Sequence, residues 1–89
     1  MANKRDLKKD INYVLGDIIE AVYVWEYTNT DKDNKQSEAI IDDAIVTFDE
    51  LITKTNAKDV DNKKAHFNAV KKELEDKGRA LIERINNLG

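Results

Sequence analysis

The chain has no cysteine, no proline and only three glycines among its 89 residues. Without cysteine it can form neither a disulfide framework nor a thiolate metal site. Proline and glycine are the residues that interrupt helices, so their scarcity favours long, unbroken ones. Charged residues make up 37% of the chain, which is typical of helices with broad solvated faces. The composition therefore predicts an all-α fold.

Long apolar runs are absent too. The densest run, residues 14–25, is interrupted by Asp17 and Glu20, so no segment approaches the roughly 18 apolar residues of a membrane span. The first ten residues carry basic side chains but no apolar stretch, unlike a secretory signal peptide. We therefore expect a cytoplasmic protein that does not bind a membrane.

The net charge of −3 is unevenly distributed along the chain. Residues 1–9 carry a net charge of +3, residues 10–53 carry −9, and residues 54–89 carry +3. An acidic middle segment repels a phosphate backbone, so we expect no nucleic-acid partner. Segments of opposite sign instead favour packing against each other, or of one copy against another.

The spacing of apolar residues predicts three helices, over about residues 4–28, 35–55 and 59–87. Asn3 is the expected N-cap of the first helix, and Asn56 and Asp59 are competing caps for the third. Short polar connections join the helices, which makes sequential neighbours antiparallel. The expected architecture is one domain, residues 1–89, folded as an up-down-up three-helix bundle with long first and third helices.

Each predicted helix has one apolar face that we expect to form the core. In the first helix the spacing of 4 and 3 residues is that of a coiled-coil-like seam. Gly78 lies on the face of the third helix, where it would permit close helix contact. The predicted core positions are Leu7, Ile11, Val14, Leu15, Ile18, Ala21, Val22 and Trp25; Ile40, Ile41, Ala44, Ile45, Phe48, Leu51 and Ile52; and Val60, Phe67, Val70, Leu74, Leu81, Ile82, Ile85 and Leu88.

The first helix has a second stripe, made of Tyr13, Gly16, Glu20, Tyr23 and Tyr27. At 100° per residue it lies about 180° from the core face, where a monomeric bundle meets water. A glycine in a helix interior costs about 1 kcal/mol relative to alanine, and no turn justifies it here. The stripe is open to two interpretations: a protein interface that approaches the backbone closely, or tyrosines on an ordinary solvated face.

Residues able to support catalysis are few. Ser37 is the only serine and His66 the only histidine, and we interpret them as a helix-capping residue and a boundary residue. The connection at Asp31 and Asp33 has Gln36 where a calcium loop requires glycine. We therefore expect no enzymatic activity, no cofactor, no metal and no small-molecule substrate. Glu20, Glu26, Asp42 and Asp43 could gather into a carboxylate cluster, but none lies at the centre of a predicted core face, so solvated charge explains them better. A small acidic metal-binding or enzymatic protein that uses carboxylates contributed by two chains remains an alternative.

The basic start gives a further alternative. Lys4, Arg5, Lys8 and Lys9 are the only candidates for binding an anion, a nucleic acid or a lipid. They spread over more than half the circumference of a helix and precede an acidic segment, so any such binding is expected to be weak.

The opening Lys4-Arg5-x-Leu7-Lys8-Lys9-x-Ile11-Asn12-Tyr13 resembles the start of a group of small helical proteins of unknown role from Bacteroidetes-type bacteria. The resemblance covers about ten residues and implies a bacterial helical protein. It brings no activity, cofactor or binding residue with it.

Together these patterns predict a non-catalytic interaction or structural module. The expected partner is a second copy of the chain or another helical protein, bound through Tyr13, Gly16, Glu20, Tyr23 and Tyr27. Tyrosine suits such a surface because its ring offers contact area while its hydroxyl stays hydrogen-bonded.

Overall fold

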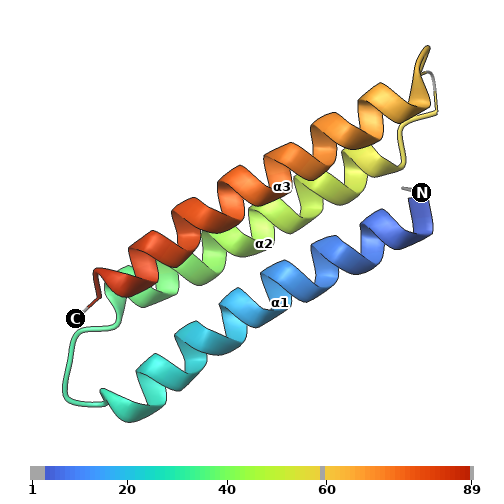
Figure 1. Ribbon diagram of the computed structural model, residues 1–89. Helices are drawn as coiled ribbons and strands as arrows, with labels where there is room; N and C mark the ends of the chain where they lie inside the picture. Colours follow the sequence, from blue (N-terminus) through green and yellow to red (C-terminus); the bar gives the residue numbers. More distant parts are fainter. Residues whose placement is uncertain (1–3, 59, 89) are drawn as a thin grey trace.

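The protein is an all-α three-helix bundle, seen in a computed structural model that describes residues 4–58 and 60–88. Helix α1 spans Lys4–Thr28, α2 Lys35–Thr55 and α3 Lys63–Asn86. Consecutive helices run antiparallel, so α1 and α3 point the same way (Figure 1). The principal extents, 51 × 19 × 16 Å, are those of an elongated rod. The predicted fold class is confirmed.

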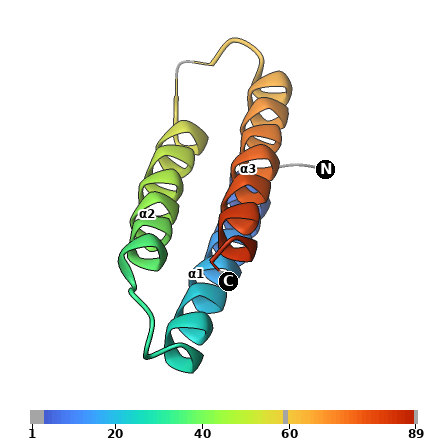
Figure 2. The same cartoon turned by 90° about the vertical axis from the view of Figure 1, so that its left-hand side faces the viewer.

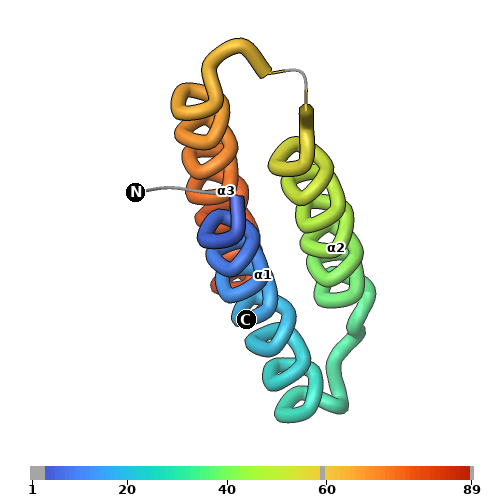
Figure 3. The backbone as a smooth tube through the Cα atoms, turned by 90° about the vertical axis from the view of Figure 1, so that its right-hand side faces the viewer, coloured from blue at the N-terminus to red at the C-terminus, as the bar shows by residue number. Residues whose placement is uncertain are grey.

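Each helix packs against both of the others. Figures 2 and 3 view the bundle from opposite sides: α3 lies in front of α1 in the first and behind it in the second, with α2 to one side. This triangular arrangement encloses one apolar core along the rod. Its buried members are Leu7, Ile11, Leu15, Ile18, Val22, Ile40, Ile41, Ala44, Leu51, Val70, Leu74 and Leu81.

The helix ends are set by asparagine and aspartate. At the start of α2, Asn34 is the N-cap residue without a side-chain capping bond, and the Lys35 backbone N–H donates to Asp33 Oδ1 at 3.0 Å. At the start of α3 the Asn62 side chain accepts from the Ala65 backbone N–H at 3.1 Å, a regular N-cap.

The prediction for the start of the third helix was wrong. Helix α3 begins at Lys63 rather than residue 59, because Asn62 holds the extended backbone of a capping residue. Asn56 is instead the C-cap of α2. The other two predicted caps, Asn3 and Asp59, lie outside the described residues.

Three predicted core residues lie at the edge of the apolar stripe and are exposed. They are Ala21, Ile45 (47% exposed) and Ile82 (48%). With two neighbours per helix, the buried sector is the one that both neighbours cover. Val14 and Trp25, also predicted core positions, are half-buried for the same reason.

Small polar residues take some of the buried positions that were not predicted. They are Ser37, Thr47 and Thr55 on α2. The Thr55 hydroxyl donates to the Leu51 carbonyl of the preceding turn at 2.7 Å, which satisfies a polar group that burial would otherwise penalise.

Two of the glycines have opposite surroundings. Gly78 is buried on α3, and a Cβ there would lie 3.2 Å from Val14 Cγ1 of α1. The missing side chain therefore lets α3 approach α1, as the sequence suggested. Gly16 is exposed, and a Cβ there would meet nothing within 4 Å.

These surroundings predict different effects of alanine at the two positions. Gly16→Ala should raise the free energy of unfolding of the monomer by about 0.5–1 kcal/mol, the usual helix-propensity gain. Gly78→Ala should raise the free energy of unfolding less, or lower it, because its Cβ presses on Val14. Urea denaturation followed by circular dichroism measures both, with Gly78→Ala/Val14→Ala as the variant that removes the pressure. Equal gains at the two glycines would contradict this packing.

Candidate functional site

The second stripe of α1 is solvent-exposed along its length. We call its five residues, Tyr13, Gly16, Glu20, Tyr23 and Tyr27, the tyrosine face. Tyr13 is 66% exposed, Tyr23 55% and Tyr27 84%, and Gly16 and Glu20 are also exposed. The burial of Leu7, Ile11, Leu15, Ile18 and Val22 on the opposite side of the same helix turns these residues outward. The structure thus gathers all the predicted interface residues on one surface.

The exposed tyrosines differ from the other large apolar side chains on the surface. The other large apolar side chains that are exposed, Val24, Ile45, Val46 and Ile82, are aliphatic. Among the described residues no side-chain hydrogen bond holds any of the three tyrosine hydroxyls. The three rings thus share one exposed face with a glycine at which an added Cβ would have no neighbour within 4 Å among the described residues.

The α2–α3 side of the bundle is closed by ion pairs. Lys54 Nζ lies 2.7 Å from Glu73, Lys77 Nζ lies 3.0 Å from Glu50 and 3.2 Å from Glu73, and Arg84 pairs with Asp43. The hydrogen bond from Lys54, followed by that from Lys77, holds the pKa of Glu73 below its ordinary value. Hydrogen bonds to Glu50 and Glu73 raise the pKa of Lys77. Lys54, Lys77 and Arg84 on this side are therefore already paired.

The fold gathers charge of one sign at each end of the rod. The start of α1 lies beside the α2–α3 connection (Figure 1), so the described residues 4–9, 58 and 60–64 share one end, with seven basic and two acidic residues. Lys4 lines a hollow of about 390 Å³ together with Lys58 and Lys63. Residues 26–43, at the other end, carry six acidic and two basic residues. There, the Glu26 charge and then partial desolvation raise the pKa of Glu38.

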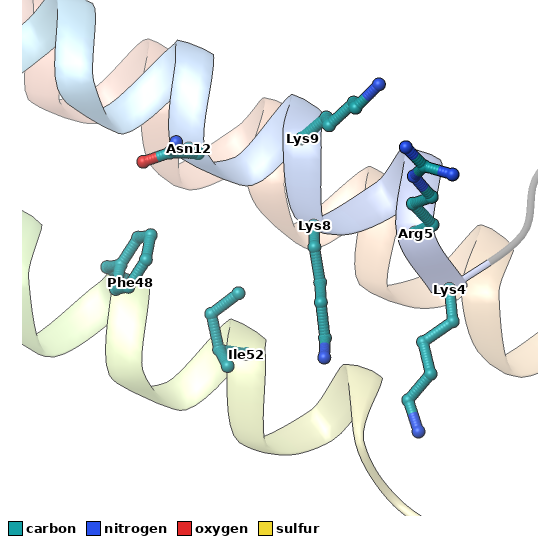
Figure 4. Close-up of a pocket in the computed structure, with 7 residues that line it drawn as sticks. All are labelled: Lys4, Arg5, Lys8, Lys9, Asn12, Phe48 and Ile52. Carbon is teal, nitrogen blue, oxygen red and sulfur yellow. The ribbon is translucent and has the colours of Figure 1, made fainter.

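A hollow of about 640 Å³ forms a groove between the first turns of α1 and the last turns of α2. Phe48 and Ile52 rise from α2 to form its floor (Figure 4). The four residues of the basic start divide around it: Lys4 and Lys8 extend toward α2, whereas Arg5 and Lys9 point away (Figure 4). All four basic residues of the predicted anion-binding group line this hollow, but only Lys4 and Lys8 extend across it.

Ser37 and His66, the residues considered for catalysis, form hydrogen bonds between helices. The buried Ser37 hydroxyl lies 2.6 Å from Glu26 Oε2 and 2.9 Å from the Asn34 carbonyl, so it joins α2 to α1 rather than capping by its side chain. His66 Nε2 lies 2.6 Å from the Lys54 carbonyl. A carbonyl only accepts, so Nε2 carries the proton and donates. His66 therefore ties α3 to the C-terminal end of α2.

The carboxylates considered for a cluster within one chain have other contacts. Asp43 is paired with Arg84, and Glu26 contacts Ser37 and lies near Glu38. Over residues 4–58 and 60–88, no group of three or more histidine or acidic side chains is placed to hold a metal ion. Within the same residues, no helix has the length and apolarity needed to cross a membrane.

Some of these contacts join residues that are distant in the sequence. Ser37 and Glu26 are separated by the first connection, and Lys4 meets Lys58 and Lys63 only because the second connection folds back beside α1. For the three lysines, the only signal in the sequence was the positive charge at the start of the chain and again around the second connection. Comparisons with family models, curated proteins and solved structures return no match. The resemblance of residues 4–13 to small bacterial helical proteins accordingly stays a prediction.

The pairing of Glu73 predicts a specific pH dependence. Because its pKa is lower in the folded state, the unfolded chain binds more protons as pH falls. The stabilisation is complete above the ordinary glutamate pKa and is lost as pH falls through the depressed value. In thermal unfolding between about pH 6 and 3, Glu73→Gln should flatten the decline relative to wild type. Glu75→Gln, an exposed neighbour on α3, is the control; an unchanged profile in Glu73→Gln would contradict the assignment.

Proposed function

We propose that the protein is a non-catalytic interaction module that self-associates through the tyrosine face of α1. The observation that carries the proposal is the exposure of three tyrosines around Gly16 on a helix whose opposite side already fills the core. Tyrosine is enriched at protein interfaces, because its rigid ring provides contact area at low entropic cost. The occupant of this face is a second copy of the same chain, in the cytoplasm of a bacterium.

The spacing of the tyrosine face supports a helix-to-helix contact. Lys9 extends the stripe by one position, and the intervals from Lys9 to Tyr27 are then 4, 3, 4, 3 and 4 residues. This is the seam spacing by which two helices interlock side chains. Lys9, like the tyrosines, is exposed and points away from the bundle (Figure 4).

Charge favours an antiparallel pair of α1 helices. One antiparallel register places Lys9 opposite Tyr27 of the second copy, Tyr13 opposite Tyr23, and Gly16 opposite Glu20. Lysine over a tyrosine ring and an offset tyrosine pair are favourable contacts. The glycine leaves room for the glutamate. A parallel pair would instead set Lys9 against Lys9 and Glu20 against Glu20, which is repulsive.

The ends of the rod reinforce this orientation. The antiparallel pair lays the basic end, with Arg5 and Lys9, along the acidic end of the second copy, where Asp31 and Asp33 follow α1. A single helix pair is a small interface, so the expected dissociation constant is in the range of roughly 10–100 μM. Exposed charges contribute, so the association should weaken with added salt.

Self-association is tested by substitution on the tyrosine face. Tyr23→Glu should remove the dimer, since it adds a charge where a ring would be buried, whereas wild type should approach the dimer mass in light scattering above about 100 μM. Val46→Glu is the matched control: Val46 is 54% exposed on α2 and should leave the mass unchanged. A wild-type chain that stays monomeric at several hundred micromolar would contradict the proposal.

Orientation is tested separately by distance measurement. The chain has no cysteine, so Thr28→Cys, at the exposed end of α1, accepts a single spin label per chain. In the antiparallel register the two labelled positions lie about 20 residues apart along the paired helices, hence roughly 30 Å, against roughly 10 Å for a parallel pair. A short distance in a sample that light scattering shows to be dimeric would keep self-association but overturn the antiparallel arrangement.

A further inference from the structure

The groove between α1 and α2 has apolar side chains that packing of the bundle does not fully bury. Phe48 and Ile52, which are only half-buried, form an apolar floor that remains open to solvent. A volume of about 640 Å³ is within the range of small-molecule sites. Neither Tyr13 nor Tyr27 lines the groove, but Lys9 borders both the groove and the surface of the proposed self-association.

The groove presents positive charge without a counter-charge. Lys4 and Lys8 both extend from α1 toward α2 above the apolar floor (Figure 4). None of the lining residues is acidic, and neither lysine forms an ion pair with any residue in the described part of the chain. The cations between α2 and α3 show the contrast, since Lys54, Lys77 and Arg84 are each paired.

We propose that this groove binds a single-chain amphiphilic anion, a long-chain carboxylate. Its alkyl chain would lie along Phe48 and Ile52, and its headgroup would sit between the ammonium groups of Lys4 and Lys8. Apolar burial supplies affinity, and the unpaired lysines supply selectivity for negative charge. The N-terminal end of α1, which borders the groove, also favours an anion.

A single-chain ligand fits this geometry better than a bilayer surface. Phe48 and Ile52 are half-buried between α1 and α2, where a single alkyl chain can reach them and a flat bilayer surface cannot. The neighbouring hollow that shares Lys4 adds Lys58 and Lys63 to the positive field around the headgroup position.

A second hollow provides an internal comparison. Between α1 and α3, about 450 Å³ is lined by apolar side chains that include Val14, Ile82 and Ile85. Its one charged lining residue is Asp17. With an apolar lining but a negative charge, this hollow should not take a carboxylate.

The test is titration of the full chain with dodecanoate below its micelle concentration, followed by isoleucine methyl NMR. Saturable shifts are expected at the Ile52 methyl groups but not at those of Ile82. Lys8→Gln should weaken binding roughly five- to tenfold, whereas Lys9→Gln, which alters a lysine that borders the same hollow but does not extend toward α2, should weaken it less than about twofold. Hexanoate should bind more than tenfold more weakly than dodecanoate, because most of the apolar contact is lost.

Three results would overturn the proposal. They are no saturable shift at Ile52, equal binding of the neutral dodecyl maltoside, and equal weakening by Lys8→Gln and Lys9→Gln. Binding only to anionic phospholipid vesicles, reduced equally by both substitutions, would assign the basic end to a membrane surface instead. Light scattering on each sample separates these results from any change in self-association, because Lys9 also borders the tyrosine face.

Discussion

Burial of the α1 seam, from Leu7 to Val22, between α2 and α3 is the constraint on which the rest of the structure depends. Of the three helices, α1 contributes five residues to the apolar core, and both other helices pack against it. That burial fixes the rotation of α1 about its axis. The direction in which every other α1 side chain points follows from it, including the tyrosines and the four basic residues at its start.

The α2–α3 side of the bundle and the outer side of α1 differ in how their side chains are paired. Between α2 and α3, two lysines pair with glutamates and one arginine pairs with an aspartate across the helix pair. On the outer side of α1, Lys9 and Glu20 form no such ion pair within the described residues, and the three tyrosine rings are exposed. The self-association proposed above would give this surface its partner.

Sequence periodicity correctly predicted the structural features that depend on a single helix. It located the seam, the tyrosine face and the close approach at Gly78, since each needs only the 3.6-residue repeat. It missed what depends on a second helix. Whether Ile45 and Ile82 are buried depends on where two neighbours sit. The start of α3 was misplaced because Asn56, Asp59 and Asn62 all suit a cap, and only the folded backbone selects Asn62. The division of the basic start likewise required the position of α2.

The distribution of charge along the rod has a consequence for kinetics. The described residues 4–9, 58 and 60–64 carry net positive charge at one end of the 51 Å rod, and residues 26–43 carry net negative charge at the other, so these charges form an electric dipole along its axis. In the proposed self-association, two such rods approaching by diffusion would exert a torque on each other before they touch. That torque would turn them head to tail, so the association rate would depend on ionic strength.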